Sequence, residues 1–110
     1  MKQYVIDQLR ETDYVKILDF LDANCEKTML EGLYRKEMPE ALLTPAQAGH
    51  APCRPHYFAI NLDVRQVSFE LLVRSSQIIR CNCIDYATRE QRDYILGFAD
   101  TMLEQLNIKI

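Results

Sequence analysis

The hydrophobic pattern of this chain starts with helical spacing in the first quarter. Apolar residues from Tyr14 to Leu21 recur at i, i+3, i+4 and i+7, and this spacing places side chains on one face of an α-helix. Thr12 or Asp13 can cap the start of such a helix, and Asn24 suits its end. The pattern therefore predicts an N-terminal helix with one buried side.

Alternation replaces the helical spacing in the second half of the chain. Apolar and polar residues alternate over 57–62, 67–74 and 78–84, as in strands with one buried face. Short connections between the three stretches predict an antiparallel meander. The stretches 4–9 and 28–35 have weaker patterns, and we interpret them as a short strand or lead-in and a further strand.

The chain ends in its clearest element, a second helix. Thr88 and Gln91 form the T-x-x-Q pattern of a capping box, and apolar residues then follow one face for three turns until Asn107, which suits the end. Two one-sided helices and a one-sided sheet are buried most simply against each other. We therefore predict a single α+β domain over 1–110, an antiparallel β-meander with the N-terminal and C-terminal helices packed on one face.

The long loop before the meander, residues 37–56, breaks this regularity. It holds all four prolines, both histidines and one of the four cysteines. Irregular segments of about twenty residues are uncommon in compact domains and are usually functional or poorly ordered. Thr44 and Pro45 can open a short helical turn that Gly49 ends. We expect any functional site to lie in this loop.

Composition and charge narrow the function classes. The 110 residues are 48% hydrophobic and 26% charged, with a net charge of −3, which is typical of a globular domain. Basic residues form no cluster of the kind that neutralises phosphates, so we expect no nucleic-acid partner. No apolar run reaches the roughly 18 residues that span a membrane, and the first residues lack the apolar core of a signal peptide. We expect a cytoplasmic protein that does not enter membranes.

Three residues of the loop are candidate metal ligands. His50, Cys53 and His56 form H-x2-C-x2-H and are ligand types that zinc uses, although the spacing is not a common zinc pattern. The prolines prevent a continuous helix here, and a fourth ligand has to come from Cys25 or Cys83. The alternative is structural: the histidines lie in a turn and at a strand start, and Cys53 anchors the loop.

A second pair of cysteines, Cys81 and Cys83, lies within the last predicted strand. In a strand, residues i and i+2 are about 6.5–7 Å apart, whereas the sulfurs of a zinc site lie about 3.8 Å apart. We therefore interpret both as small buried hydrophobes in phase with Ile79. Cys53 can also be a nucleophile beside a histidine, but the sequence places no third, orienting residue.

The outer face of the predicted sheet is the other candidate site. It carries charged and aromatic residues beside apolar ones, which suits a protein partner or self-association: Tyr57, Glu70, Leu72, Arg74 and Arg80. Because no catalytic constellation is visible, we expect a small interaction or regulatory domain without catalytic activity and without a required cofactor, in the form of a homodimer. The alternatives are a zinc-type metal-binding domain that uses the His/Cys loop, and a small enzyme with its site under residues 37–56.

Overall fold

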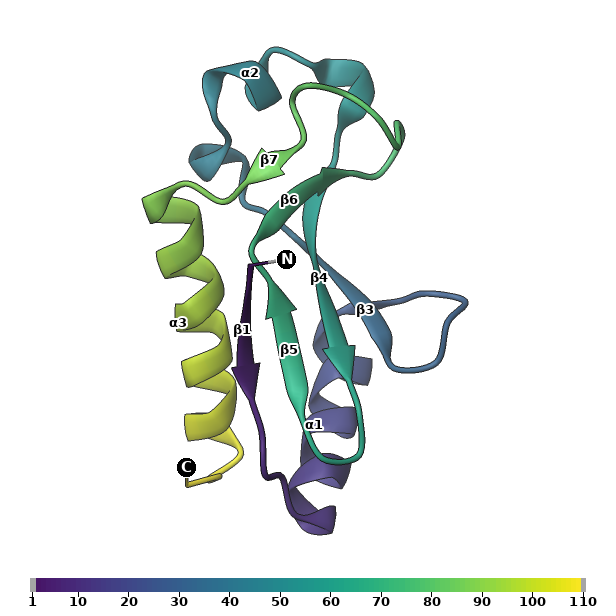
Figure 1. The fold of residues 1–110 in the computed structure, drawn as a ribbon, viewed down its shortest axis with the longest axis vertical. Helices are drawn as coiled ribbons and strands as arrows, with labels where there is room; N and C mark the ends of the chain where they lie inside the picture. Colours follow the sequence, from purple (N-terminus) through teal and green to yellow (C-terminus); the bar gives the residue numbers. More distant parts are fainter. Residues whose placement is uncertain (1, 110) are drawn as a thin grey trace.

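An antiparallel sheet forms the centre of the computed structural model, which describes residues 2–109 (Figure 1). Two long helices pack against the sheet, and three short helical turns lie in the proline-rich loop. The elements are β1 (Gln3–Ile6), α1 (Glu11–Asn24), β2 (Glu26–Lys27), β3 (Leu33–Glu37), a 3-10 turn (Glu40–Leu42), α2 (Pro45–Ala48), a second 3-10 turn (Ala51–Cys53), β4 (His56–Leu62), β5 (Val67–Glu70), β6 (Leu72–Ser75), β7 (Asp85–Tyr86) and α3 (Arg89–Gln105).

The strands are ordered β1-β5-β4-β3-β2, and β6 pairs with both β4 and β7. The chain over β5 and β6 is one interrupted strand against β4. His56 pairs with Ser75, and Ile60 pairs with Phe69. Four residue steps along β4 therefore correspond to six along the antiparallel partner. The extra residues around Leu71 form a bulge, which bends the sheet and turns β6 toward the end where the proline-rich loop lies (Figure 1).

Both helices cover the same face of the sheet. The ring of Phe98 from α3 lies 6.1 Å from Phe58 of β4, 6.4 Å from Phe69 of β5 and 6.0 Å from Phe20 of α1, measured between centroids. These rings join a core to which the helical stripes contribute fully buried side chains: Ile17, Leu21, Ile95, Ala99 and Met102. The predicted α+β meander with both helices on one face is confirmed.

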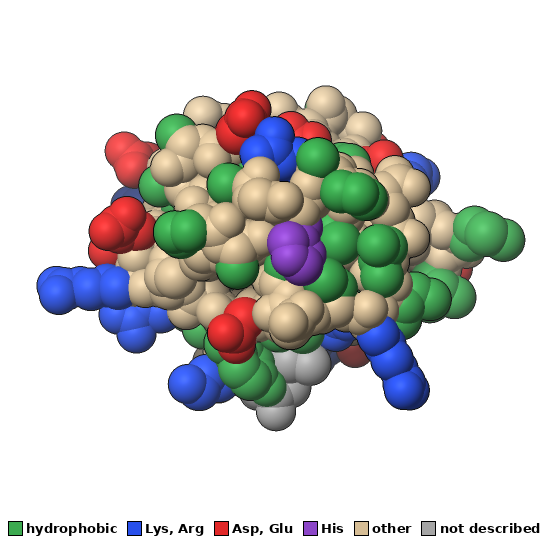
Figure 2. All heavy atoms as spheres, turned by 90° about the horizontal axis from the view of Figure 1, so that it is seen from above, with side chains coloured by type: hydrophobic (Ala, Val, Ile, Leu, Met, Phe, Trp, Pro, Cys, Tyr) green, Lys and Arg blue, Asp and Glu red, His purple; other side chains and the backbone are tan. Residues whose placement is uncertain are grey.

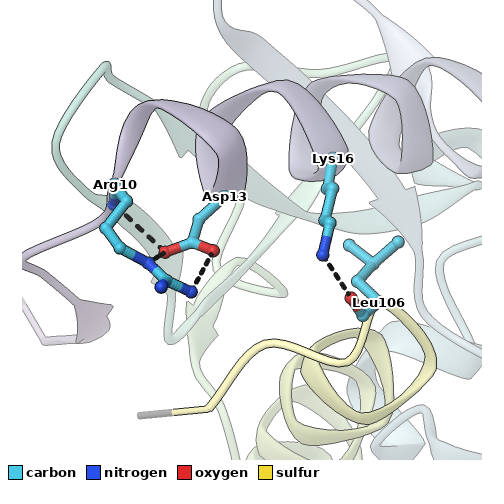
Figure 3. Close-up of polar contacts among 4 residues, drawn as sticks. All are labelled: Arg10, Asp13, Lys16 and Leu106. Atoms are coloured by element: carbon cyan, nitrogen blue, oxygen red, sulfur yellow. Dashed lines mark hydrogen bonds and ion pairs between the residues drawn. The ribbon is translucent and has the colours of Figure 1, made fainter.

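The start of α1 is capped differently from the prediction. The helix begins after Arg10, and the Asp13 carboxylate accepts the Arg10 backbone N–H and two guanidinium N–H groups, each at 3.1 Å (Figure 3). Asp13 therefore satisfies donors from within the first turn, where a negative charge also favours the helix dipole. Near this start of α1, Lys16 Nζ donates to the carbonyl of Leu106 at the end of α3 (Figure 3). The capping box of Thr88 at the start of α3 is confirmed.

Two predicted strands are wrong in extent. Of the stretch 28–35, residues 33–35 belong to β3, whereas residues 28–32 form the turn between β2 and β3, where Gly32 adopts φ +81°. The stretch 78–84 forms no strand, and only Asp85–Tyr86 pairs with β6. Ser75 Oγ accepts the N–H groups of Gln77 and Ile78, which closes a turn and ends the strand. Residues 76–84 therefore form an irregular loop, with Ile79 92% exposed.

The N-terminal stretch joins the sheet as β1, which pairs with β5 along the edge. The short helical turn at Thr44 is also confirmed, since α2 spans Pro45–Ala48 and Gly49 follows it. In Figure 1, α2 and β7 lie together at one end of the molecule. None of the helices within residues 2–109 combines the length and apolar character needed to cross a lipid bilayer.

Candidate metal centre

The proline-rich loop and the loop 76–84 meet at one end of the sheet and bring four metal-binding side chains together. The four are His50 and Cys53 from the first loop and Cys81 and Cys83 from the second, and their donor atoms all lie within 4.8 Å of one another. His50 Nδ1 is 3.1 Å from Cys81 Sγ and 3.9 Å from Cys53 Sγ. Thiolate and imidazole are the ligands of structural zinc sites, so this cluster can hold a metal ion.

A single 3-10 turn places the first two ligands on one side of the chain. His50 N–H donates to the carbonyl of Gln47, at the end of the first turn of α2, and Cys53 N–H donates to the carbonyl of His50 at 2.9 Å. Side chains at i and i+3 eclipse in a 3-10 turn, so both point the same way. The prolines do prevent a continuous helix, but we did not expect this short turn, which tolerates Pro52 because it lies within the first residues of the turn, where its missing N–H leaves no bond unmade.

A turn also brings the other two ligands together. Ile84 N–H donates to the carbonyl of Cys81 at 3.0 Å, so the chain curls around Asn82 instead of extending. The strand geometry that separates cysteines at i and i+2 does not apply here. The interpretation of both as buried hydrophobes within a strand is therefore wrong: Cys83 is buried, but Cys81 is partly exposed, and the chain there is a loop.

Buried polar side chains hold each loop against the other. The Ser75 hydroxyl, at the end of β6, donates to the carbonyl of Cys53 at 2.6 Å. Gln47 Nε2, in α2, donates to the carbonyl of Cys83 at 3.1 Å. Gln47 is 1% exposed and Ser75 is 7% exposed. Each loop therefore has one cysteine backbone fixed by a side chain from outside that loop.

A second glutamine extends this network to α3. Gln91 Nε2 donates to Gln47 Oε1 and to the carbonyl of Leu42, both at 2.9 Å. Both glutamines also accept the N–H of their own N-cap threonine, Thr44 or Thr88. The two capping boxes thus face each other, and the start of α3 is tied through Gln47 to the backbone of a candidate ligand.

The remaining sequence candidates lie outside the four-residue cluster. His56 is 1% exposed at the start of β4, with Nε2 3.5 Å from Cys83 Sγ and with Nδ1 lacking a hydrogen-bond partner. Burial lowers the pKa of His56, with a smaller effect from Arg54, and this favours the neutral ring. Cys25 follows α1, and burial raises the pKa of its thiol to about 11.

Ionisation within the cluster favours a thiolate at one position. The pKa of Cys81 is lowered to about 7, mainly because its sulfur accepts the backbone N–H of Cys83 and then through the other cluster side chains. Burial, followed by the neighbouring thiols, raises the pKa of Cys83 to about 12. Metal binding needs deprotonated thiols, and the lowered pKa of Cys81 favours its thiolate form.

Access to the cluster is uneven. Cys53 and Cys83 are each 2% exposed, whereas His50 and Cys81 reach the surface in part. Figure 2 looks onto this end of the molecule and shows a histidine at the surface among apolar side chains. The other histidine, His56, is buried.

The predicted interaction residues are divided between two places. Tyr57, Glu70 and Arg74 lie on the face of the sheet opposite the helices, where they line part of a hollow of about 420 Å³. The Arg74 guanidinium forms an ion pair with Glu70 at 2.6 Å. Leu72 is half-buried on β6, and Arg80 is exposed on the loop 76–84, away from the strands.

Sequence reasoning found His50 and Cys53 and named Cys83 as a candidate fourth ligand, but it missed Cys81. The signal was the combination of an H-x2-C and a C-x-C pair, two short motifs that each place donors on one side of a turn. Comparison with known proteins gives no match to a family model, a characterised protein or a solved structure.

Proposed function

We propose that this protein is a zinc-binding domain with a mononuclear centre formed by His50, Cys53, Cys81 and Cys83. The observation that carries the proposal is the convergence of four donor atoms within 4.8 Å from two loops that are distant in sequence. Zinc bonds of about 2.3 Å to sulfur and 2.0–2.1 Å to nitrogen place tetrahedral ligands about 3.5–3.8 Å apart. Shifts of about 1 Å or less bring the cluster to that spacing.

The donor set favours zinc over harder ions. Three thiols and one imidazole are soft or intermediate ligands, which calcium and magnesium do not select. The Cys3His set supplies four protein ligands, the number that structural zinc sites use. We therefore propose a structural role, in which the metal joins the proline-rich loop to the loop 76–84.

Zinc content measured by native mass spectrometry tests this proposal. Protein purified without chelator is expected to carry one zinc per chain. Cys53→Ser, Cys81→Ser and Cys83→Ser are each expected to lower zinc affinity at least tenfold, because each removes a ligand. Cys25→Ser is the matched control, since Cys25 lies outside the cluster and is expected to leave zinc content unchanged.

Cobalt substitution distinguishes the two histidines. A Co²⁺ complex with thiolate ligands in tetrahedral geometry has intense visible and near-ultraviolet absorption. His50→Ala is expected to change this spectrum and weaken binding, whereas His56→Gln is expected to keep the ligand-field bands. Wild-type protein that binds neither metal, or a Cys25→Ser variant as impaired as Cys53→Ser, would overturn the proposal.

A second proposal concerns the face of the sheet that the helices leave uncovered. We propose that this face binds a protein partner or a second copy of the chain, through the hollow that Tyr57, Glu70 and Arg74 help to line. The observation that favours it is the stacking of Arg35 over the Tyr57 ring at 4.6 Å, which places a planar cation and an aromatic ring together beside the Glu70–Arg74 ion pair. Sedimentation of wild type and Tyr57→Ala tests self-association: a dimer that the variant weakens supports it, and a monomer at high concentration contradicts it.

A further inference from the structure

The four candidate ligands differ in their exposure to solvent. We therefore expect them to differ in their reactivity toward oxidants. Cys53 and Cys83 are each 2% exposed. Cys81 is partly exposed and lines an open depression of the surface with its neighbours on the loop 76–84. Since zinc has no redox chemistry, an oxidant that reaches the centre has to react at a sulfur, and Cys81 offers the accessible one.

Two further sulfurs lie close enough to complete an oxidation. The donor atoms of Cys53 and Cys83 are both within 4.8 Å of Cys81 Sγ. A disulfide needs the sulfurs at about 2.05 Å, so Cys81 has to move toward one of them, and it lies in a loop outside the helices and strands. A reactive, partly exposed cysteine beside a resolving cysteine is the usual arrangement of a redox-responsive thiol.

We propose that Cys81 is the site at which peroxides modify this protein, and that its oxidation expels the zinc. This inference rests on the zinc centre proposed above. The Cys81 thiolate attacks one oxygen of hydrogen peroxide, which breaks the O–O bond, forms a sulfenic acid and releases hydroxide. The thiolate of Cys53 or Cys83 then attacks the Cys81 sulfur, forms the disulfide and displaces a second hydroxide.

The electrons and ligands balance in this sequence. Two thiolates lose two electrons in total, and peroxide is reduced to two hydroxide ions, which the buffer protonates to water. The centre then retains His50 and one thiolate, two ligands where a structural zinc site needs four. Zinc leaves, and the loop 76–84 loses its metal connection to the proline-rich loop.

Wild-type protein alone provides the first test. Zinc-loaded protein is treated with substoichiometric hydrogen peroxide in the presence of dimedone, which traps sulfenic acids, and with a chromophoric chelator that reports free zinc. We expect the trapped adduct on Cys81 and zinc release in step with thiol loss. A first adduct on Cys53 or Cys83 would overturn the inference, as would zinc retained after the thiols are oxidised.

Two ligand-exchange variants sharpen this test. Cys81→His and Cys53→His each keep four ligands and leave two cysteines in the centre, but only the second keeps the accessible thiolate. Cys81→His is expected to release zinc at least tenfold more slowly in peroxide, and Cys53→His to react within about threefold of wild type. Equal rates for both would contradict the role of access. Protein that never binds zinc refutes the proposed centre, whereas protein that binds zinc but resists peroxide refutes only this inference.

Discussion

Gln47 offers the most direct test of how the fold positions the candidate centre. Its side chain is 1% exposed and makes three hydrogen bonds: Oε1 accepts from Thr44 N–H at 3.1 Å and from Gln91 Nε2 at 2.9 Å, and Nε2 donates to the Cys83 carbonyl at 3.1 Å. Gln47→Met keeps the length and helix propensity of the side chain but removes all three bonds. The variant therefore isolates the polar contribution.

The expected loss of stability follows from these contacts. A buried hydrogen bond contributes about 1 kcal/mol net, and a buried group left without a partner costs about 1–3 kcal/mol. The variant loses three bonds and leaves the Cys83 carbonyl unpaired, whereas Gln91 still donates to Leu42. We expect the free energy of unfolding to fall by about 3 kcal/mol, out of a total of about 5–15 kcal/mol for a domain of this kind.

Urea unfolding followed by circular dichroism measures this loss. The experiment is done first with a chelator, so that metal binding does not contribute, and then with zinc. Gln105→Met is the control, because Gln105 is exposed on α3 and its substitution is expected to change stability by less than about 0.5 kcal/mol. With zinc present, we also expect Gln47→Met to weaken metal binding, because the Cys83 backbone is no longer held.

Two results would refute parts of this reasoning. If Gln47→Met unfolds within 1 kcal/mol of wild type in chelator, the glutamine network does not stabilise the fold as its geometry indicates. If stability falls but zinc affinity does not change, the network supports the fold without positioning the cluster.

Three other substitutions test local features of the fold by the same unfolding assay. Gly32→Ala is expected to cost more than about 2 kcal/mol, because φ is +81° and a Cβ atom would lie 2.5 Å from the Leu62 carbonyl oxygen; a neutral result would contradict that geometry. Gly97→Ala is expected to stabilise α3 by about 0.5–1 kcal/mol, since nothing lies within 4 Å of the added atom; destabilisation would show a contact that the structure lacks. Tyr34→Phe is expected to cost about 1 kcal/mol at neutral pH through its 2.7 Å hydrogen bond to Asp22. Because that bond lowers the pKa of Asp22, its contribution is present above about pH 3.9 and is lost as pH falls further, so the two proteins are expected to converge in acid; a constant difference would contradict the assignment.

Local patterns predicted the two long helices and two of the three meander strands. The spacing of apolar residues in α1 and α3 and the alternation in β4 and β5 depend only on neighbours in the chain. The capping boxes of Thr44 and Thr88 are equally local, because each closes within four residues. These features allowed the α+β architecture, with both helices on one face, to be predicted.

The prediction of the third meander strand was wrong because a contact between residues distant in the sequence decides the structure there. Residues 78–84 alternate as a strand does, but Ser75 Oγ captures the N–H of Ile78 at 3.0 Å while donating to the carbonyl of Cys53. That bond joins residues 22 positions apart. The competition between a strand and this turn is decided by a contact that forms only when the two loops meet.

The sequence by itself determined the two long helices, two strands of the meander, the caps at Thr44 and Thr88, and the concentration of both histidines and all four prolines in one irregular loop. Only the tertiary structure decided which of these residues meet. It brought Cys81 and Cys83 beside His50 and Cys53, and it left His56 next to the cluster and Cys25 at the end of α1. The physical reason is that metal-ligand geometry in loops depends on turn conformations, and buried side chains such as Gln47 and Ser75 select those turns through hydrogen bonds across the fold.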